Sequence, residues 1–461
     1  MQSFVVWNDE VEGRLDCFFY QPIFVELEKK IKKLTSKTLG DYIINISGGA
    51  TPEKDEPEKY YSELSENGVP FLRVQNVTEE GVSLEDCKYI NFDTHHGMLK
   101  RSQVKKGYLI TKITGVGRMA VSSVAPNGFD GNINQHLVAI KTVSYQTSEV
   151  LAAFLNSNIG ERLAFRRSTG GTRPALDYQA LKTIPIVFKP EIVESMQSAY
   201  SQKKEKEAEA QRLLDSIDGY VLDEIGIKLP KIEGKMSFVV WSDKVAGRID
   251  PYYYMSEVNI IKQRLSKIYG THYLAEIIED IYRYPTFYGF EYQKSGVPVI
   301  KGENIEKSGM IDPTQNFDCI TNEIHQQFFK THLREGDLLF TVRGIIGKIG
   351  LFDGFVPEAN INANVIKIRI SNEHNPSFYW AILNSNVGQK IIQNLVSGQV
   401  QKTITVPDIK NIQIPIPPLE IQNKIAKEVK RRISEAERLK AEASKIIEKA
   451  KKKVEEMILG D

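Results

Sequence analysis

The stretch Ser3-Phe4-Val5-Val6-Trp7 decides how this chain is organised, because it returns as Ser237-Phe238-Val239-Val240-Trp241. Over positions 3–20 and 237–254, 11 of 18 residues are identical. A second match lies at the far end of each half, where Leu155-Asn156-Ser157-Asn158 returns as Leu383-Asn384-Ser385-Asn386. A repeat of about 230 residues is far longer than a solenoid unit, so each copy is expected to fold as a module of domain size. Two homologous modules in one chain form a pseudo-dimer, which is suited to contacting two similar objects at a fixed separation.

The composition is that of a globular protein without a membrane span or an export signal. With 461 residues, 41% hydrophobic and 26% charged, the chain can bury more than one core. Its longest apolar runs have the length of strands, as at residues 412–416, so the sequence predicts no transmembrane helix. The N-terminus carries acidic residues where a signal peptide has lysines and an apolar stretch, so we expect a cytoplasmic protein.

Cysteine and charge content narrow the chemistry further. Cys17, Cys87 and Cys319 are isolated and odd in number, so neither a disulfide framework nor a structural zinc site is expected, and no cofactor is predicted. Lys plus Arg number 60 and Asp plus Glu number 59, which gives a net charge of +1. Any DNA-binding surface would therefore have to arise from local segregation of charge.

Each half shows the same order of predicted elements. Five segments recur in matching pairs, at residues 69–74 and 297–301, 107–111 and 336–341, 132–134 and 360–362, 152–165 and 379–396, and 184–188 and 412–418. The first three pairs read as strands, the fourth as a helix and the last as a proline-punctuated strand. The module is therefore predicted to be α/β or α+β with a sizeable sheet.

A long helix is predicted to follow each module. Residues 191–217 and 419–459 are rich in Lys, Glu and Ala, and the apolar positions from Ile425 to Met457 recur with a mean spacing of 3.56 residues. Such a narrow stripe is most simply buried when the two helices form an antiparallel coiled coil. Asp218-Gly219 is predicted to end the central helix.

The resulting domain plan has four parts. We expect a first recognition domain at 1–188, a central region with long helix and linker at 189–235, a second recognition domain at 236–416, and a C-terminal long helix at 417–461. Residues 228–235, with a proline and a glycine, are taken as the boundary between the halves.

Several local stretches resemble one known family. Ser47-Gly48-Gly49-Ala50-Thr51-Pro52, then residues 68–77, then Gly170-Gly171-Thr172-Arg173-Pro174, and finally residues 414–422 follow one another in the order seen in specificity subunits of type I restriction–modification systems. The resemblance covers essentially the whole chain. The second half departs from it, with Asp280-Ile281-Tyr282-Arg283-Tyr284-Pro285 in place of the glycine loop and Gln399-Val400-Gln401-Lys402 in place of the Thr-Arg-Pro turn.

The resemblance implies a DNA-recognition subunit. Each module would read one half of an interrupted double-stranded target, and the helices with the repeated module ends would dock two methyltransferase subunits, to which restriction and translocase subunits are added. Two readers on one face of B-DNA need a separation of about 34–36 Å, which helices of this length can span. Residues 41–68 and 270–296 diverge strongly, so the two half-sites are expected to be unlike and the target asymmetric.

Basic and amide side chains near predicted turns are the candidates for DNA contact, because Arg, Lys, Asn and Gln read base edges and basic groups hold phosphates. They are Arg73, Asn76, Lys112, Arg118, Arg173, Lys301, Asn304, Arg343, Lys348 and Lys402. Each basic candidate could equally be an ordinary exposed residue. For Asn76 and Asn304, a turn-capping role is favoured over base reading.

Other polar residues are interpreted as structural. Asn132 and Asn360 precede apolar strands, where structural turns are favoured. His95, His96 and His325 lack metal-ligand partners at suitable spacing, so they are expected to face solvent.

Catalysis by the chain alone is not expected. Asn375-Pro376-Ser377-Phe378 lacks the second proline of the loop with which adenine methyltransferases grip a flipped base. Gly115-Val116-Gly117 falls between two β segments and not between a strand and a helix, where a cofactor loop belongs. The alternative to a DNA reader is a non-catalytic scaffold, with two modules on a coiled-coil spacer that joins protein partners without binding DNA.

Overall fold

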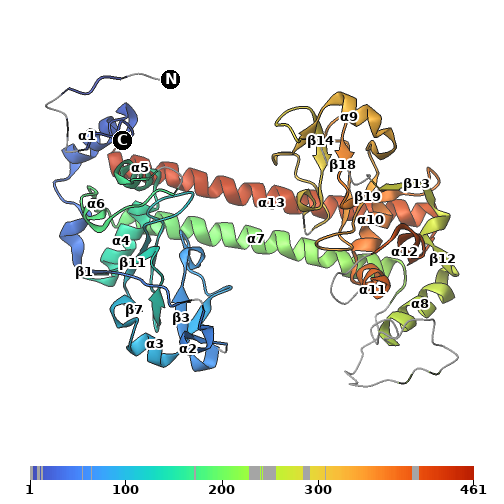
Figure 1. The fold of residues 1–461 in the computed structure, drawn as a ribbon, viewed down its shortest axis with the longest axis horizontal. Coiled ribbons are helices and arrows are strands. Elements are labelled where there is room, and N and C mark those ends of the chain that lie inside the picture. The colour runs from blue at the N-terminus through green and yellow to red at the C-terminus, as the bar shows by residue number, and fades with distance from the viewer. Residues whose placement is uncertain are drawn as a thin grey trace. The chain divides into compact units, whose positions relative to one another are not determined.

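A computed structural model describes most of the chain. It covers residues 4–7, 11, 14–53, 55–63, 65–170, 173–227, 239, 241, 256–283, 291–306, 308–396 and 404–460. The chain divides into two compact units, unit 1 at residues 1–207 and 440–461 and unit 2 at residues 208–439 (Figure 1). Each unit therefore contains one β-rich module and a part of each long helix.

Unit 1 is a mixed α/β module. Its helices are α1 (Pro22–Leu34), α2 (Pro57–Tyr60), α3 (Phe92–His96), α4 (Tyr145–Leu155), α5 (Asn158–Arg167), α6 (Tyr178–Lys182) and the first part of α7 (Glu191–Glu224), with 3-10 turns η2 (Leu39–Tyr42), η3 (Ser65–Asn67), η4 (Val74–Asn76) and η5 (Lys100–Ser102). Its strands are β1 (Ile43–Gly48), β2 (Tyr61–Ser62), β3 (Val69–Leu72), β4 (Val77–Thr78), β5 (Gly81–Val82), β6 (Lys88–Ile90), β7 (Gln103–Lys105), β8 (Leu109–Lys112), β9 (Ser122–Val124), β10 (Asp130–Ile133) and β11 (Leu137–Thr142).

Unit 2 repeats this plan. Its helices are α8 (Ser256–Tyr269), α9 (Asn322–Gln327), α10 (Pro376–Asn384), α11 (Asn386–Leu395), α12 (Val406–Lys410) and the first part of α13 (Leu419–Leu459), with 3-10 turns η8 (Leu274–Glu276), η9 (Gly302–Asn304) and η10 (Phe329–Thr331). Its strands are β12 (His272–Tyr273), β13 (Ile278–Arg283), β14 (Val297–Ile300), β15 (Cys319–Ile320), β16 (Leu338–Thr341), β17 (Ile349–Leu351), β18 (Asn360–Ile361), β19 (Val365–Ile370) and β20 (Gln413–Ile414).

Strand order shows that the repeat extends to topology. Within the described residues, the larger antiparallel sheet runs β1-β11-β8-β9 in unit 1 and β13-β19-β16-β17 in unit 2. The edge strand has a register shift at the same place, between Ile43 and Asn45 and between Ile278 and Asp280. A second sheet pairs β10 with β3 and β18 with β14, both in parallel. The predicted equivalence of residues 132–134 with 360–362 is confirmed by this pairing.

The repeated Leu-Asn-Ser-Asn motif marks an elbow between two helices. The sequence predicted one helix-like stretch here in each half, but α4 ends before α5 and α10 ends before α11. Ser157 and Ser385 cap the second helix by accepting a hydrogen bond from the backbone N–H of Gly160 and Gly388. A Cβ at Gly160 would lie 2.1 Å from the carbonyl oxygen of Phe154, so only glycine permits this close approach.

The long helices pair antiparallel in both units. In unit 1, Lys206 of α7 forms an ion pair with Glu442 of α13 at 3.2 Å. In unit 2, Ala210 packs against Ala436 and Leu439, and Lys424 pairs with Glu224 at 2.7 Å. The predicted apolar stripe of α13 is buried at Ile425, Val429, Ile433, Ala436, Leu439, Ala443, Ala450 and Val454. The antiparallel coiled-coil pairing and the α/β fold class expected from the sequence are thus confirmed.

The end of α7 differs from the prediction. The helix continues through Asp218-Gly219 to Glu224, because Val221 and Leu222 are buried in the core of unit 2 and the Asp218 carboxylate accepts a hydrogen bond from the backbone of Asn386. Burial of these side chains outweighs the helix penalty of a glycine, which is about 1 kcal/mol. The predicted boundary at 228–235 lies outside the described residues.

The closing proline-rich segments are shorter than predicted. Residues 184–188 contribute a bridge between Thr38 and Pro185, and β20 is two residues long and pairs with β12. Prolines limit both ladders because they have no backbone N–H to donate.

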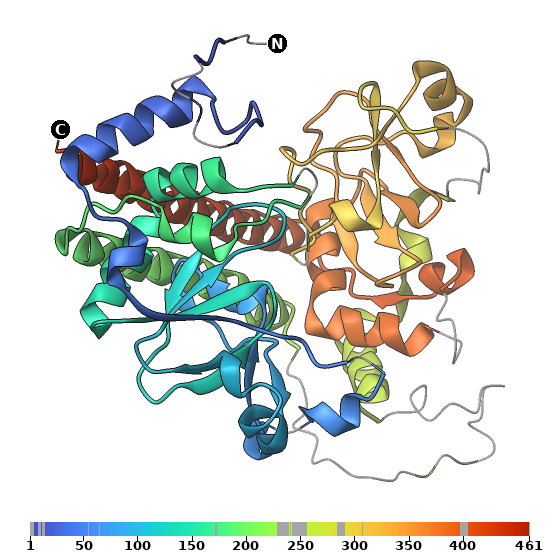
Figure 2. The ribbon, with the colours of Figure 1, turned by 60° about the vertical axis from the view of Figure 1, so that its left-hand side comes forward.

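The cores of both units join sheet and helices. In unit 1, Ala450, Val454 and Ile458 of α13 pack in one cluster with Ile31 of α1 and Leu163 of α5, and α1 lies over this end of α13 in Figure 2.

Among the helices that the structure describes, none combines the length and the apolar character needed to cross a lipid bilayer.

Candidate nucleic-acid interface

The same capped turn follows the parallel strand of each module. Arg73 precedes η4 and Lys301 precedes η9, and their backbone N–H groups donate to the side-chain oxygens of Asn76 at 3.0 Å and Asn304 at 2.8 Å. We call residues 73–76 and 301–304 the capped turns. The backbone of each capped turn fixes the position from which the basic side chain of its first residue projects.

Both capping asparagines are buried. The Asn76 amide donates to the carbonyls of Ser83 at 3.1 Å and Glu85 at 3.2 Å, and the Asn304 amide donates to Gln315 at 2.9 Å. These amides are used within the turn, so Asn76 and Asn304 are withdrawn as base-reading candidates. The turn-capping interpretation describes both residues.

In unit 1, Arg73 lines an open cavity of about 770 Å³. Its Nη2 donates to the carbonyl of Asp86 at 2.9 Å, while its Nε has no hydrogen-bond partner. Tyr61, Lys88 and Tyr89 line the same cavity, and the Lys88 ammonium lies 5.3 Å from the ring centre of Tyr61. The cavity thus combines two cations with three aromatic rings, those of Tyr61, Phe71 and Tyr89, and one carboxylate, that of Glu63. Cations and aromatic rings are groups that bind phosphates, guanine edges and base faces.

In unit 2, Lys301 lies in a different electrostatic setting. Its ammonium pairs with Asp318, lies 3.8 Å from Glu303, and sits 4.4 Å from the ring centre of Tyr292. Burial disfavours the charge on Lys301, but the ion pair with Asp318 outweighs it and raises the pKa of the ammonium. Lys301 is therefore a cation already neutralised by its neighbours.

Strand register makes these two neighbourhoods equivalent position by position. Pro70 pairs with Tyr89 and Pro298 with Cys319, which places Lys88 and Asp318 at matching positions. Ser62 pairs with Tyr89, and Gln293 pairs with Cys319. The residues before them, Tyr61 and Tyr292, therefore also occupy matching positions. The tyrosine is shared between the modules, whereas the charge beside the capped turn is inverted.

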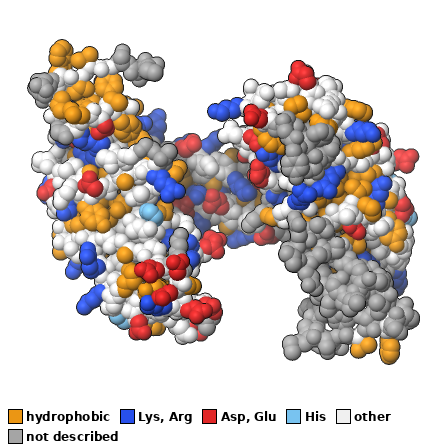
Figure 3. All heavy atoms as spheres, viewed as in Figure 1, with side chains coloured by type: hydrophobic (Ala, Val, Ile, Leu, Met, Phe, Trp, Pro, Cys, Tyr) orange, Lys and Arg blue, Asp and Glu red, His pale blue; other side chains and the backbone are white. Residues whose placement is uncertain are grey.

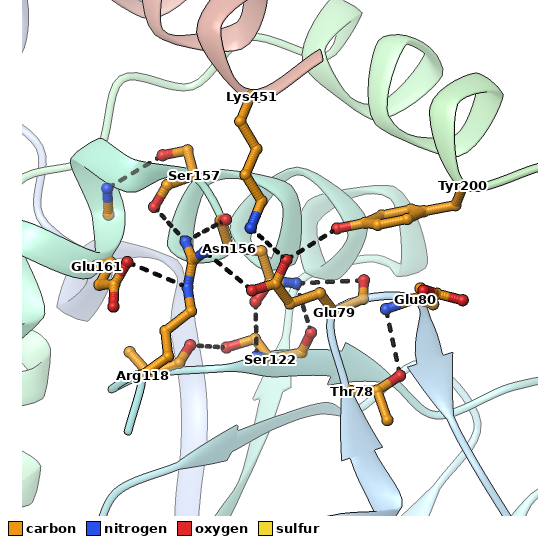
Figure 4. Close-up of polar contacts among 12 residues, drawn as sticks. Thr78, Glu79, Glu80, Arg118, Ser122, Asn156, Ser157, Glu161, Tyr200 and Lys451 are labelled. Carbon is orange, nitrogen blue, oxygen red and sulfur yellow. Dashed lines mark hydrogen bonds and ion pairs between the residues drawn. The ribbon is translucent and has the colours of Figure 1, made fainter. Parts of the chain in front are cut away.

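Three other candidates serve the interior of their modules. Lys112 is buried and donates to the carbonyl of Val116 at 2.8 Å, and burial lowers the pKa of its ammonium. Arg118 lies between Glu79 at 2.9 Å and Glu161 at 3.5 Å (Figure 4). Lys348 donates to the carbonyl of Gly302 at 3.4 Å, and burial lowers its pKa against the opposing effect of Glu306. Each of these side chains contacts groups of its own module, and their proposed contact with DNA stays a prediction.

Two candidates are exposed on matching sides of the modules. Arg173 lies on the loop before α6, where the Gly115 N–H donates to the carbonyl of Pro174 at 3.2 Å. Arg343 lies on the β16–β17 loop, which corresponds to residues 113–121 between β8 and β9. Both stay candidates for phosphate contact. Lys402 lies outside the described residues.

The histidine prediction was wrong for two of the three residues. His95 and His325 are buried, and each contacts the strand asparagine of its own module, His95 with Asn132 at 2.5 Å and His325 with Asn360 at 3.3 Å. His96 is exposed as expected. The Asn132 and Asn360 side chains are structural, and the His–Asn pair is a second buried feature common to both modules.

Charge is mixed on the surface. On the face shown in Figure 3, basic and acidic side chains are interspersed over the described parts of both units. The residues that the structure describes include no group of three or more His, Cys, Asp or Glu placed to bind a metal ion.

Sequence reasoning missed Tyr61, Lys88 and Tyr89. Their signal is an aromatic residue beside a lysine, as in Lys59-Tyr60-Tyr61 and Lys88-Tyr89. It becomes informative only when β2, β6 and β3 are known to pair, which places these separate segments around Arg73.

A family model matches part of the chain. Residues 274–449 match the type I restriction modification DNA specificity domain. The chain carries this specificity domain. Over these residues the match confirms the family resemblance read from the sequence, and the first half has the same strand order in its larger sheet.

The curated relatives and solved structures that match this chain are named as specificity subunits of type I restriction systems. The specificity subunit of the type I restriction enzyme EcoBI from Escherichia coli is 28% identical over 156 residues, covering 33% of this chain and 31% of that protein. The putative MjaX specificity subunit of Methanocaldococcus jannaschii is 33% identical over 123 residues, covering 27% and 28%. The match thus spans about a third of the length of these relatives. The crystal structure of a type I restriction-modification S subunit from M. genitalium covers 92% of this chain and 94% of that chain, at 12% identity and a TM-score of 0.39.

Proposed function

We propose that the specificity-domain protein binds double-stranded DNA at two half-sites of unlike sequence, one for each module, and has no catalytic activity of its own. The supporting observation is the pair of capped turns, which share a backbone and differ in charge. An arginine fork such as that of Arg73 matches the two acceptors on the major-groove edge of guanine. Asp318, held by Lys301, can accept a hydrogen bond from the cytosine amino group.

A target selection tests this function. The full chain, alone and with a methyltransferase subunit encoded beside it, is incubated with a random DNA pool, and the bound fraction is sequenced. We expect enrichment of two different half-sites separated by a constant gap. Failure to enrich any sequence in either condition would contradict the proposal and would leave a protein-joining scaffold.

We also propose that the repeated segments 3–20 and 237–254, with the long helices, dock two methyltransferase subunits, to which restriction and translocase subunits are then added. Trp7 is 69% exposed and Trp241 is 68% exposed, and Val5 and Val239 beside them are exposed as well. Identical apolar groups that stay at the surface in both copies are typical of an interaction site. We expect this protein and the subunits that it binds in the cytoplasm.

Native mass measurement tests the docking proposal. Trp7→Ser and Trp241→Ser should each reduce the number of bound methyltransferase subunits from two to one, and the double variant should bind none. Ile44→Ser, which removes another exposed apolar side chain, is the control. Two subunits retained by the double variant would contradict this role.

A further inference from the structure

One carboxylate in unit 1 links the reading module to both long helices. Glu79 lies in the turn between β4 and β5, and Figure 4 shows three side chains converging on it. Its Oε1 lies 2.9 Å from Arg118 Nη1, and its Oε2 lies 2.7 Å from Lys451 Nζ of α13. The Tyr200 hydroxyl of α7 donates to the same Oε2 at 3.5 Å. Glu80, the next residue, pairs with Lys203 of α7.

Arg118 extends these contacts to the far side of the module. Its Nη2 donates to the carbonyls of Asn156 and Ser157, at the elbow between α4 and α5. The loop that carries Arg118 also bonds to the segment of Arg173, through a bridge between Thr114 and Ala175. A continuous set of polar contacts therefore runs from α7 and α13 to a loop whose exposed cation stays a candidate for phosphate contact.

The Glu79 contacts are partly shielded from solvent. The side chains of Glu79, Arg118 and Lys451 are 22%, 16% and 16% exposed, so water screens them less than it screens surface pairs. Burial, and next the Glu79 carboxylate, raise the pKa of the Tyr200 hydroxyl, which keeps its proton and its donor role. Three partners approaching from different elements restrict how the module can tilt on the helix pair.

In unit 2 the matching turn lies between the bridged residues Ile305 and Ile311 and is held by different contacts. There the Trp380 indole N–H donates to the carbonyls of Gly309 at 3.2 Å and Ile349 at 3.1 Å. A Cβ on Gly309 would lie 2.7 Å from the indole nitrogen, so the turn is packed against α10 at close range. The turn in unit 1 is thus held to the long helices by charged groups, whereas the turn in unit 2 is held to α10 of its own module by an aromatic contact.

We propose that Glu79 is a positioning residue, which fixes the first module on the α7–α13 pair and so sets the gap between the two DNA half-sites. This inference rests on the proposed function. A tilt that displaces the contact loops by about 3.4 Å along DNA corresponds to one base pair. The Glu79 contacts touch no base, so they set spacing and leave the half-site sequences alone.

The experiment compares two neighbouring lysines of α13 in the full chain with its methyltransferase subunit. Lys451→Met removes one Glu79 contact, and Lys452→Met removes an exposed charge one residue away. Four proteins are compared: these two variants, Glu79→Gln and the wild type. Each is used to select targets from a DNA pool in which the half-sites are fixed and the gap between them varies. For Lys451→Met and Glu79→Gln we expect unchanged half-sites and a preference for the best gap over its neighbours that falls about two- to fivefold. Lys452→Met should match the wild type.

Each result decides a different statement. A wild-type gap preference retained by Lys451→Met would overturn the positioning role, even if Glu79→Gln fails to fold. A loss of half-site preference at an unchanged gap would also overturn it, because that pattern belongs to a base-reading residue. A wild-type protein that enriches no bipartite target would overturn the proposed function, and the inference with it.

Discussion

The two capped turns have the same backbone and opposite electrostatics. In unit 1 the turn places Arg73 beside Lys88, and in unit 2 it places Lys301 beside Asp318. The buried asparagine, the parallel strand pair and the nearby tyrosine are common to both. The groups that build the turn are therefore separate from the groups that would contact DNA. Recognition can therefore change without loss of the fold.

The largest effect is expected at Arg73. Arg73→Ala should weaken binding to the selected target by about 1–3 kcal/mol and relax preference at one or two positions of one half-site. Lys106→Ala, which removes an exposed cation of the same module, is the control. Titration against single-base variants of the target is the measurement. Equal weakening of all variants would assign Arg73 to phosphate contact, and no change would remove it from the interface.

The buried asparagines should affect stability unequally. Asn76→Ala breaks one accepted and two donated hydrogen bonds to the main chain and should cost about 1–3 kcal/mol of unfolding free energy. Asn304→Ala breaks one accepted and one donated hydrogen bond, while Gln315 keeps its bonds to the carbonyls of residues 304 and 312, so it should cost less. Hydrogen exchange of amides in each capped turn reports the two local losses. A larger loss in unit 2 would contradict the comparison.

Charge changes beside the turns should alter the salt dependence in opposite directions. Asp318→Asn releases Lys301 and should steepen the dependence of non-specific DNA binding on salt by about one counterion. Lys88→Gln should reduce it by about one, because a cation is lost from the unit 1 cavity. Binding constants at several salt concentrations test both variants. Slopes that do not change would mean that neither position lies near phosphates.

The smallest effect concerns pH in unit 2. Burial, with a further contribution from His332, lowers the pKa of His325, so the folded state binds this proton less readily than the unfolded state. Stability is then full above the unfolded pKa of about 6.5 and falls as pH drops below it, by at most about 1.4 kcal/mol per pH unit for one group. Unfolding of the wild type and His325→Gln between pH 7.5 and 5.5 should show a smaller loss in the variant. An equal loss in both would exclude His325 as the source.

The repeat made most of the fold predictable. Matching segments around residues 132–134 and 360–362 predicted equivalent strands, and the apolar spacing of α13 predicted its buried face. The end of α7 could not be predicted, because Gly219 is held in the helix by the packing of the residues that follow it. The burial of His95 depends on Asn132, 37 residues away, which no local pattern indicates.

The candidate site was predictable only in part. Arg73 and Lys301 were proposed because each follows a strand and precedes a turn, and the structure confirms that placement. Arg118 was chosen by the same rule, but its side chain enters a network with Glu79 that involves contacts far apart in the sequence. Tyr61 and Lys88 were missed because they come together only through the pairing of β2 with β6. Side-chain direction at a loop is decided by such long-range contacts.

The central claim is that equivalent turns read different half-sites. It is tested most directly by repeating the random-pool selection with Arg73→Ala and with Lys301→Ala, each in the full chain with its methyltransferase subunit. We expect each variant to relax preference in one half-site, the two half-sites to differ, and the gap to stay constant. Relaxation of the same half-site by both variants, or full preference retained in both half-sites by both, would contradict it.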